Sequence, residues 1–164
     1  MPDDPAIPPG SRRSFLVRSA GIAAGAAALS IVPRPPLRAA PQAMRELIRN
    51  IVGEAPLRTG KVRLDVPSLV ENGNAVSLTV SVDSPMTPTD HVKAIHIVNE
   101  KNPQPHVISV TLGPHAGRAR ISTRIKLADS QRIMALAQMS DGSFWSASAD
   151  VIVALAACLE DLRQ

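Results

Sequence analysis

Period-two alternation of apolar and polar residues constrains the fold of this chain more than any other feature. Segment 118–127 shows it best, since its odd-numbered positions are mainly apolar: Ala119, Ile121, Thr123, Ile125 and Leu127. Its even-numbered positions are basic or hydroxylated: Arg118, Arg120, Ser122, Arg124 and Lys126. Successive side chains of a β-strand point to opposite faces of a sheet, so this segment predicts a strand with one buried and one basic face. The basic face is either solvated or a contact surface for an anionic partner.

The same alternation recurs along most of the chain. Six further segments are predicted to be strands: 62–66, 76–82, 92–98, 107–112, 133–139 and 145–155. Turn-forming residues separate the strands at intervals of about ten residues, and 113–117 is predicted to be a hairpin connection. Seven short strands of this kind predict an all-β, immunoglobulin-like antiparallel β-sandwich, with a small barrel as the alternative.

One segment follows a different period. Met44, Leu47, Ile48 and Ile51 are spaced as on one face of a helix, and Gly53 is placed to end it. We therefore expect a short N-terminal helix over 41–52, before the strands begin. The 164 residues suffice for one domain of ordinary size.

Residues 1–39 are typical of an export signal. Arg12 and Arg13 are followed by Phe15 and Leu16, and then by an apolar run over 19–32 that is rich in Ala and Gly. This order is typical of a twin-arginine signal, which directs export to the periplasm. The apolar run is about 14 residues, shorter than the roughly 20 of a spanning helix, so a membrane anchor is the less favoured alternative. Cleavage is expected after position 39, or as late as position 43.

Removal of this signal changes the charge of the protein. The full chain has a formal net charge of +4, but residues 40–164 contain 13 basic and 12 acidic residues. Aromatic residues make up only 2% of the chain, so no stacking platform for bases is visible. A nearly neutral chain of this kind predicts no nucleic-acid partner, and no membrane partner once the signal is cleaved.

The histidines do not predict a metal site. His91, His96, His106 and His115 are spaced by five, ten and nine residues, without a closing pair of ligands. The sequence also has no Gly-rich phosphate loop, and nothing marks an oxyanion site or a substrate cleft. We therefore expect no metal, no cofactor and no catalytic residue.

Cys158 is the residue whose chemistry stands out. It is the only cysteine, so in an oxidising compartment it has no partner for an intramolecular disulfide. Its thiol is reactive, bonded to another chain, or structurally inert. If the last strand ends near position 153, an extended tail of about 3.3 Å per residue lets the sulfur reach about 15 Å outward. We accordingly divide the chain into a signal over 1–39, a sandwich over 40–153 and a cysteine-bearing arm over 154–164.

Four segments resemble the SoxY family of sulfur carriers. They are Pro-Ser-Leu-Val-Glu-Asn-Gly at 67–73, Ser-Pro-Met-Thr at 84–87, Asn-Pro-Gln-Pro at 102–105 and Thr-Arg-Ile-Lys-Leu-Ala-Asp-Ser-Gln at 123–131. The twin-arginine signal fits the same family. The resemblance implies an immunoglobulin-like sandwich that forms a heterodimer with a SoxZ-like subunit. It also implies that Cys158 carries sulfur intermediates covalently during thiosulfate oxidation.

The resemblance further implies that other periplasmic proteins catalyse the chemical steps. The carrier is not itself an enzyme. Its thiol is presented to a c-type cytochrome that loads thiosulfate, to a hydrolase that releases sulfate, and to a dehydrogenase that oxidises the remaining sulfur. The less favoured alternatives are an interaction module whose Cys158 is inert or forms a disulfide, and an enzyme that uses Cys158 as a nucleophile.

The arm departs from the usual pattern of the family. Typical members end in a Gly-Gly-Cys-Gly-Gly arm, whereas this chain has Ala-Ala-Cys-Leu-Glu over 156–160 and resembles the variant group with an Ala-Ala-Cys-Ile-Glu arm. Leu159 and Leu162 make this arm bulkier than a glycine arm, so it is expected to pass narrow enzyme channels less readily. Glu160 and Asp161 add negative charge near the sulfur, which disfavours the thiolate and repels an anion such as thiosulfate.

Overall fold

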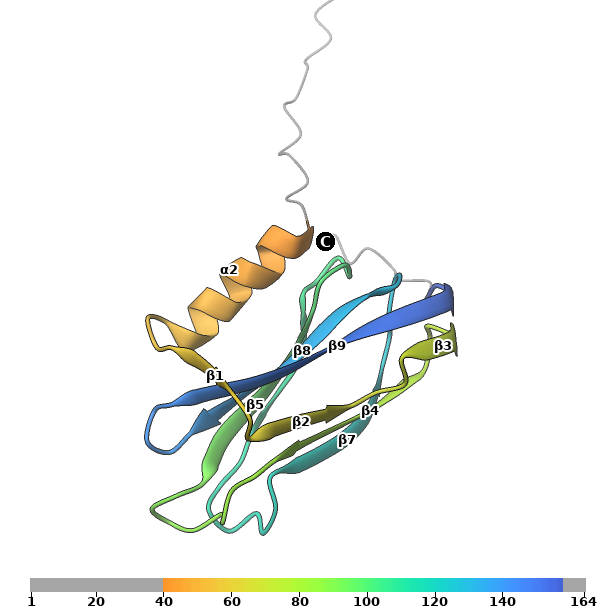
Figure 1. Cartoon of the computed structure of the whole chain (residues 1–164). Helices are drawn as coiled ribbons and strands as arrows, with labels where there is room; N and C mark the ends of the chain where they lie inside the picture. The colour runs from red at the N-terminus through yellow and green to blue at the C-terminus, as the bar shows by residue number, and fades with distance from the viewer. Residues whose placement is uncertain (1–39, 158–164) are drawn as a thin grey trace, which may run out of the picture. The chain divides into compact units, whose positions relative to one another are not determined.

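The apolar strand faces meet between two β-sheets in the computed structural model, which describes residues 40–157 (Figure 1). The expected signal residues Arg12, Arg13, Phe15 and Leu16 lie outside the described residues. Cys158 and the rest of the arm, 159–164, also lie outside them.

Nine strands make up the two sheets of the described region. The larger sheet has, in spatial order, β1 (Leu57–Thr59), β9 (Phe144–Leu155), β8 (Gln131–Met139), β5 (Val92–Asn99) and β6 (His106–Thr111), and β3 (Leu69–Asn72) also pairs with β9. The smaller sheet has the order β2 (Val62–Asp65), β4 (Val76–Val82) and β7 (Arg120–Ile125). The predicted immunoglobulin-like β-sandwich is confirmed.

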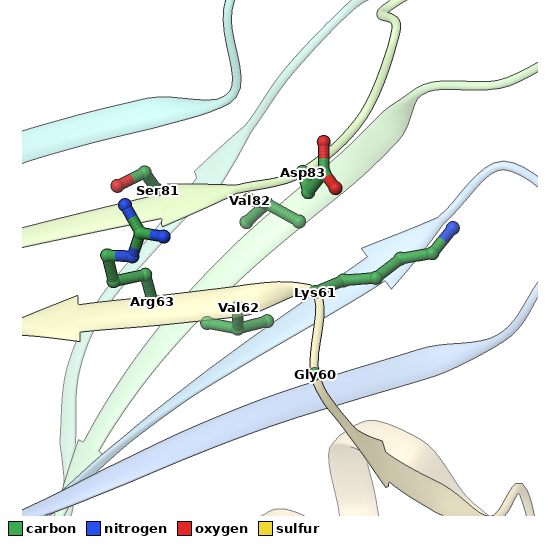
Figure 2. A pocket seen from close by; sticks show the side chains of 7 residues that line it. All are labelled: Gly60, Lys61, Val62, Arg63, Ser81, Val82 and Asp83. Carbon is green, nitrogen blue, oxygen red and sulfur yellow. The ribbon is translucent and has the colours of Figure 1, made fainter.

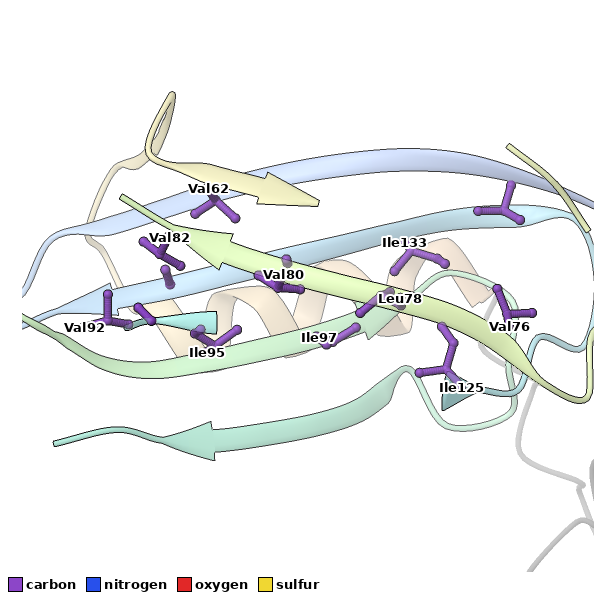
Figure 3. Packing of buried hydrophobic residues seen from close by; sticks show 14 of the residues in the cluster. Val62, Val76, Leu78, Val80, Val82, Val92, Ile95, Ile97, Ile125 and Ile133 are labelled. Carbon is purple, nitrogen blue, oxygen red and sulfur yellow. The ribbon is translucent and has the colours of Figure 1, made fainter. Parts of the chain in front are cut away.

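The core lies between the sheets because alternate residues of each strand point inward. In β4, Val76, Leu78, Val80 and Val82 are buried, and the residues between them are partly or fully exposed. Figure 3 shows these side chains packed against inward-facing residues of the larger sheet, which include Val92, Ile95, Ile97 and Ile133. Burial of aliphatic side chains from both sheets is the main force that holds the sandwich together.

The helix α2 (Ala40–Val52) lies against the outer face of the larger sheet, on the side away from the smaller sheet (Figures 1 and 3). Its Met44 is buried, as the helical spacing predicts. Ala94, Val98 and Leu136 of the larger sheet are buried although they are not part of the cluster between the sheets. The helix thus gives this sheet a second apolar layer. Within residues 40–157, no helix is long and apolar enough to cross a membrane.

Two short strands were not predicted, and both run parallel to β9. β1 pairs with residues 144–146 and β3 with residues 152–155. All three residues of β1 are exposed, and β3 has no buried residue, so neither produces the alternation that a half-buried strand shows. Their pairing joins positions more than eighty residues apart, a relationship that local sequence does not reveal.

The segment 113–117 is not a hairpin connection. It joins β6 to β7, and β6 pairs with β5 in the larger sheet whereas β7 pairs with β4 in the smaller sheet. The turn signal was therefore correct, but the chain crosses from one sheet to the other. Turn residues do not specify which sheet the next strand joins, because that choice depends on packing between the sheets.

Candidate functional site

Backbone hydrogen bonds hold the C-terminal end of β9 against the residue that follows β3, Gly73, and against the chain that follows β7, at Leu127. The Gly73 nitrogen donates to the Leu155 carbonyl at 2.8 Å, and the Leu127 nitrogen donates to the Gly73 carbonyl at 2.8 Å. The Ala157 nitrogen then donates to the Leu127 carbonyl at 3.0 Å. Ala157 is buried, so the residue that precedes Cys158 is fixed to the sandwich. We call Gly73, Leu127 and Ala157 the tail clamp.

The tail clamp depends on the absence of a side chain at position 73. A Cβ atom there would lie 2.9 Å from the Ala157 nitrogen, 3.1 Å from a methyl carbon of Val153, and closer still to the Leu127 carbonyl oxygen. Real Cβ atoms do not approach backbone atoms so closely. Gly73 is thus required by the close approach of three chain segments.

A polar network holds the Leu127 side of the tail clamp. The side chain of Asn102 accepts from the Ala128 nitrogen at 2.9 Å and donates to the Lys126 carbonyl at 2.9 Å. The Gln131 amide nitrogen donates to the same Asn102 oxygen at 2.8 Å, and its oxygen accepts from the Lys101 nitrogen at 2.7 Å. Side-chain amides therefore tie the loop before β6 to the chain between β7 and β8.

Ser130 connects this network to β9 itself. The Val153 nitrogen donates to the Ser130 hydroxyl at 2.9 Å, and this hydroxyl lies 3.5 Å from the Val153 carbonyl oxygen. An ion pair of 2.9 Å between Lys101 and Asp129 lies beside the same loops. Because both groups of that pair are exposed, it contributes little to stability. It nevertheless holds the pKa of Asp129 below its ordinary value, mainly through the hydrogen bond from Lys101.

Three of the four segments that resemble a known family meet at this end of the sandwich. Segment 67–73 contains β3 and Gly73, segment 102–105 begins with Asn102, and segment 123–131 contains Leu127 and Gln131. The fourth segment, 84–87, instead contributes the buried Met86, which has a positive φ of 51° before β5. These contacts join residues that are distant in the sequence, so no local pattern predicted a structural role for them. Their contacts show that Gly73, Asn102, Ser130 and Gln131 hold the end of β9 and Ala157 in place.

The last strand ends at Leu155, as the segment 145–155 predicted, which is two residues beyond the boundary at position 153 drawn between the sandwich and the arm. β9 extends to Leu155, and the hydrogen bond of Ala157 carries the fixed part of the chain to the residue before Cys158. The reach of about 15 Å rested on a chain that leaves the sheet near position 153, and this premise is wrong because the chain stays hydrogen-bonded to the sandwich as far as Ala157.

The histidines do not converge on a metal site. The described residues contain no group of three or more His, Cys, Asp or Glu side chains placed to hold a metal ion. His96 and His106 do share one partner, since their ring nitrogens lie 2.6 Å and 2.7 Å from the hydroxyl of Ser109. Partial burial lowers the pKa of His96, and the nearby His106 lowers it further. His91 contacts the Thr87 carbonyl, and His115 is exposed.

These features define the class of the protein, which is an immunoglobulin-like β-sandwich whose last strand leads directly into a tail with the only cysteine. The family model of sulfur oxidation protein SoxY matches residues 48–158, and the chain belongs to this family. The matched region ends at Cys158. No curated protein sequence matches the chain.

Solved structures share the fold. The sulfur carrier protein SoxY from Chlorobium limicola f thiosulfatophilum superposes with a TM-score of 0.58 at 23% identity, covering 68% of this chain and 96% of that chain. The superoxide reductase (neelaredoxin) of Ignicoccus hospitalis gives a TM-score of 0.51 at 18% identity, covering 57% of this chain and 80% of its own. The superoxide reductase of Nanoarchaeum equitans gives 0.50 at 12% identity, covering 58% and 100%. At these identities the likeness concerns the fold alone.

Proposed function

We propose that this chain carries sulfur intermediates as covalent adducts on Cys158 during the oxidation of thiosulfate or a related sulfur compound. The observation that carries the proposal is the match to the family of sulfur oxidation protein SoxY, which extends to residue 158, the only cysteine. The Chlorobium structure with the same fold is a sulfur carrier protein. The chain is not an enzyme in this proposal, because other proteins carry out each chemical step.

The chemistry follows from a thiolate that alternates between free and sulfur-bound forms. The Cys158 thiolate and thiosulfate form a sulfur–sulfur bond, and two electrons pass to a c-type cytochrome. A hydrolase then adds water to the terminal sulfonate, which leaves as sulfate with release of two protons, and a persulfide remains on Cys158. A dehydrogenase passes six electrons from that remaining sulfur to an electron-accepting cytochrome, while the sulfur takes three oxygen atoms from water and six protons are released. A second hydrolysis then frees the thiolate as sulfate leaves. Only the thiolate is nucleophilic enough for the first step.

The tail clamp supports a carrier role because it holds the residue that precedes Cys158. Ala157 is buried and hydrogen-bonded, so the cysteine begins one residue beyond a fixed point of the sandwich. A fixed base reduces the conformational entropy that a partner enzyme must remove when it binds the tail. The acidic residues Glu160 and Asp161 disfavour loading by an anion, so the partner enzyme has to supply compensating positive charge.

We also propose that the protein is exported by its twin-arginine signal, with Arg12, Arg13, Phe15 and Leu16, and that it acts in the periplasm. It also includes a heterodimer with a SoxZ-like subunit. Leu69 of β3 and Ile152 of β9 are directly paired across the strands, and their side chains are 64% and 61% exposed. An exposed pair of aliphatic side chains next to the tail is suited to burial against a partner subunit.

Intact mass spectrometry of the protein from its native periplasm tests the carrier role. Under sulfur-oxidising conditions we expect an added mass that maps to Cys158 and that a thiol reductant removes. The Cys158→Ser variant should lose both the adduct and sulfur oxidation, and it should still bind the SoxZ-like subunit. An unmodified Cys158, or full function of the serine variant, would favour the interaction module instead. Turnover of a sulfur compound by the purified chain alone would favour an enzyme.

A further inference from the structure

The outward face of the smaller sheet carries a trough that the carrier role does not use. Its floor consists of the small hydroxyl side chains on the outer face of β4, which are Ser77, Thr79 and Ser81. Long arginine side chains form its rims on the flanking strands: Arg63 on β2, and Arg120 and Arg124 on β7. We call these six residues the basic trough.

The pairing register places the rims opposite each other. Ser81 of β4 pairs with Arg63 on one side and with Arg120 on the other. Ser77 likewise pairs with Arg124. Figure 2 shows the Arg63 side chain extending from β2 toward Ser81, whereas the Lys61 side chain extends away from Ser81.

The surface has hollows at both ends of β4. Three open hollows of 410, 550 and 230 Å³ all involve this strand. The first is bordered by Arg63, the second by Arg124 and the third by Arg120. The contrast between serines in the centre and arginines at the sides explains the shape, because the arginine stems stand higher than the floor.

The arginines of the trough have no carboxylate partners within the described residues. The ion pairs of that region join Lys101 to Asp129 and Arg132 to Asp150, and neither pair lies on this face. Arg118 and Lys126, at the two ends of β7, extend the positive charge. Two carboxylates lie on the same face: Asp65 of β2 is paired with Thr79, and Asp83 borders the hollows next to Arg63 and Arg120 without an ion pair to either. The basic side chains still outnumber them. The face is therefore basic although residues 40–164 as a whole are nearly neutral.

We propose that the basic trough binds an acidic, extended segment of a partner protein. Arg120 and Arg124 are four residues apart on one strand, or about 13 Å, which matches carboxylates four residues apart in an extended peptide. Arginine binds carboxylates in a bidentate manner, and the hydroxyl groups of the floor can donate to or accept from a peptide backbone. The proposal does not use the Cys158 thiol, so this proposal and the carrier role can each fail a test without the other.

Other anionic partners fit the surface less well. The exposed large hydrophobic residues of the described region are Leu57, Leu69, Ile152 and Leu155, and none lies on β2, β4 or β7. The trough therefore has no apolar side chain to insert into a membrane. None of its six residues is aromatic, so it has no ring on which a nucleic-acid base could stack.

Titration of the ¹⁵N-labelled full-length chain with a peptide of about eight residues, alternating Glu and Ser, tests this proposal by NMR. We expect chemical-shift changes confined to β2, β4 and β7, and weaker binding when NaCl is raised from about 50 to about 300 mM. The charge-reversed variant Arg63→Glu/Arg120→Glu/Arg124→Glu should bind at least about tenfold more weakly. Because charge reversal can disturb folding, Arg63→Gln/Arg120→Gln/Arg124→Gln is measured too and should show an intermediate loss.

A matched variant separates the trough from general charge effects. Arg45→Glu/Arg49→Glu/Lys93→Glu changes the charge by the same amount on α2 and β5, and it should bind the Glu-Ser peptide as the unmodified chain does. Shift changes outside the smaller sheet, or equal losses in both charge-reversed variants, would overturn the proposal. Tighter binding of a single-stranded oligonucleotide or of phosphatidylglycerol vesicles would overturn it in favour of those partners.

Discussion

Gly73 and Ala157 lie so close together that a Cβ atom on the glycine would be 2.9 Å from the alanine nitrogen. The two residues are far apart in the sequence, and Leu127 bonds to both through its backbone. The position from which the tail leaves the sandwich is therefore set by three segments that meet without intervening side chains. Any group added at position 73 must push the tail away from Leu127.

We predict that Gly73→Ala lowers the free energy of unfolding by about 1–3 kcal/mol, because the added methyl overpacks the tail clamp. Urea denaturation measures the loss, and hydrogen exchange of the Ala157 amide should become faster. Gly113→Ala is the matched control, since a Cβ there meets nothing within 4 Å. Equal stability of the two variants would contradict this account of the tail clamp.

Removal of the Asn102 side chain should destabilise the tail clamp at Leu127, because Asn102 bonds to the backbone on both sides of that residue. Asn102→Ala leaves the Ala128 nitrogen without its acceptor and the Lys126 carbonyl without its donor. We expect a loss of about 1–3 kcal/mol in urea denaturation, together with faster exchange of the Ala128 amide. Gln104→Ala, at an exposed position of the same loop, should change neither measurement.

The sequence predicts those parts of the fold that depend on the pattern of burial. Segment 76–82 coincides with β4, and the helix predicted over 41–52 matches α2 to within one residue. β1 and β3 escaped prediction because their residues are exposed and their pairing with β9 joins distant parts of the chain. Long-range pairing follows from how the sheets pack, and the sequence of a single strand does not specify its partner.

The candidate site was predictable in chemistry and not in geometry. The single cysteine pointed to position 158 from composition alone, and that position remains a prediction because it lies outside the described residues. The role of Gly73 required knowledge of which backbones approach it. The hydroxyl that His96 and His106 share likewise depends on the β5–β6 register, which shifts between Ile97 and Val98.

The lowered pKa of His96 predicts a loss of stability in mild acid. Its pKa lies below the ordinary value of 6.5, so between the two values the unfolded chain binds more protons than the folded chain. Stability should therefore be full above about pH 6.5 and fall as the pH drops below it. His96→Gln should flatten this dependence in thermal unfolding between about pH 7.5 and 5.5.

His115→Gln serves as the comparison for that pH series, because this histidine is exposed in the connection between β6 and β7. It should leave the slope of melting temperature against pH unchanged. Since the His96 variant also loses the contact with Ser109, its overall stability can change, and only the slope is diagnostic. An unchanged slope in His96→Gln would show that another group titrates.

The exposed pair of Leu69 and Ile152 gives the sharpest test of the proposed heterodimer. Leu69→Glu/Ile152→Glu should weaken binding of the SoxZ-like subunit at least about tenfold in calorimetric titration, because two carboxylates would have to be desolvated at the interface. The free energy of unfolding should change by less than about 0.5 kcal/mol for each substitution, since both side chains are largely in solvent. Thr111→Glu/Ala116→Glu adds the same charge at other exposed positions and should bind normally. If this control binds as weakly as the Leu69/Ile152 variant, the loss comes from net charge; if both bind normally, the partner contacts a different face of the sandwich.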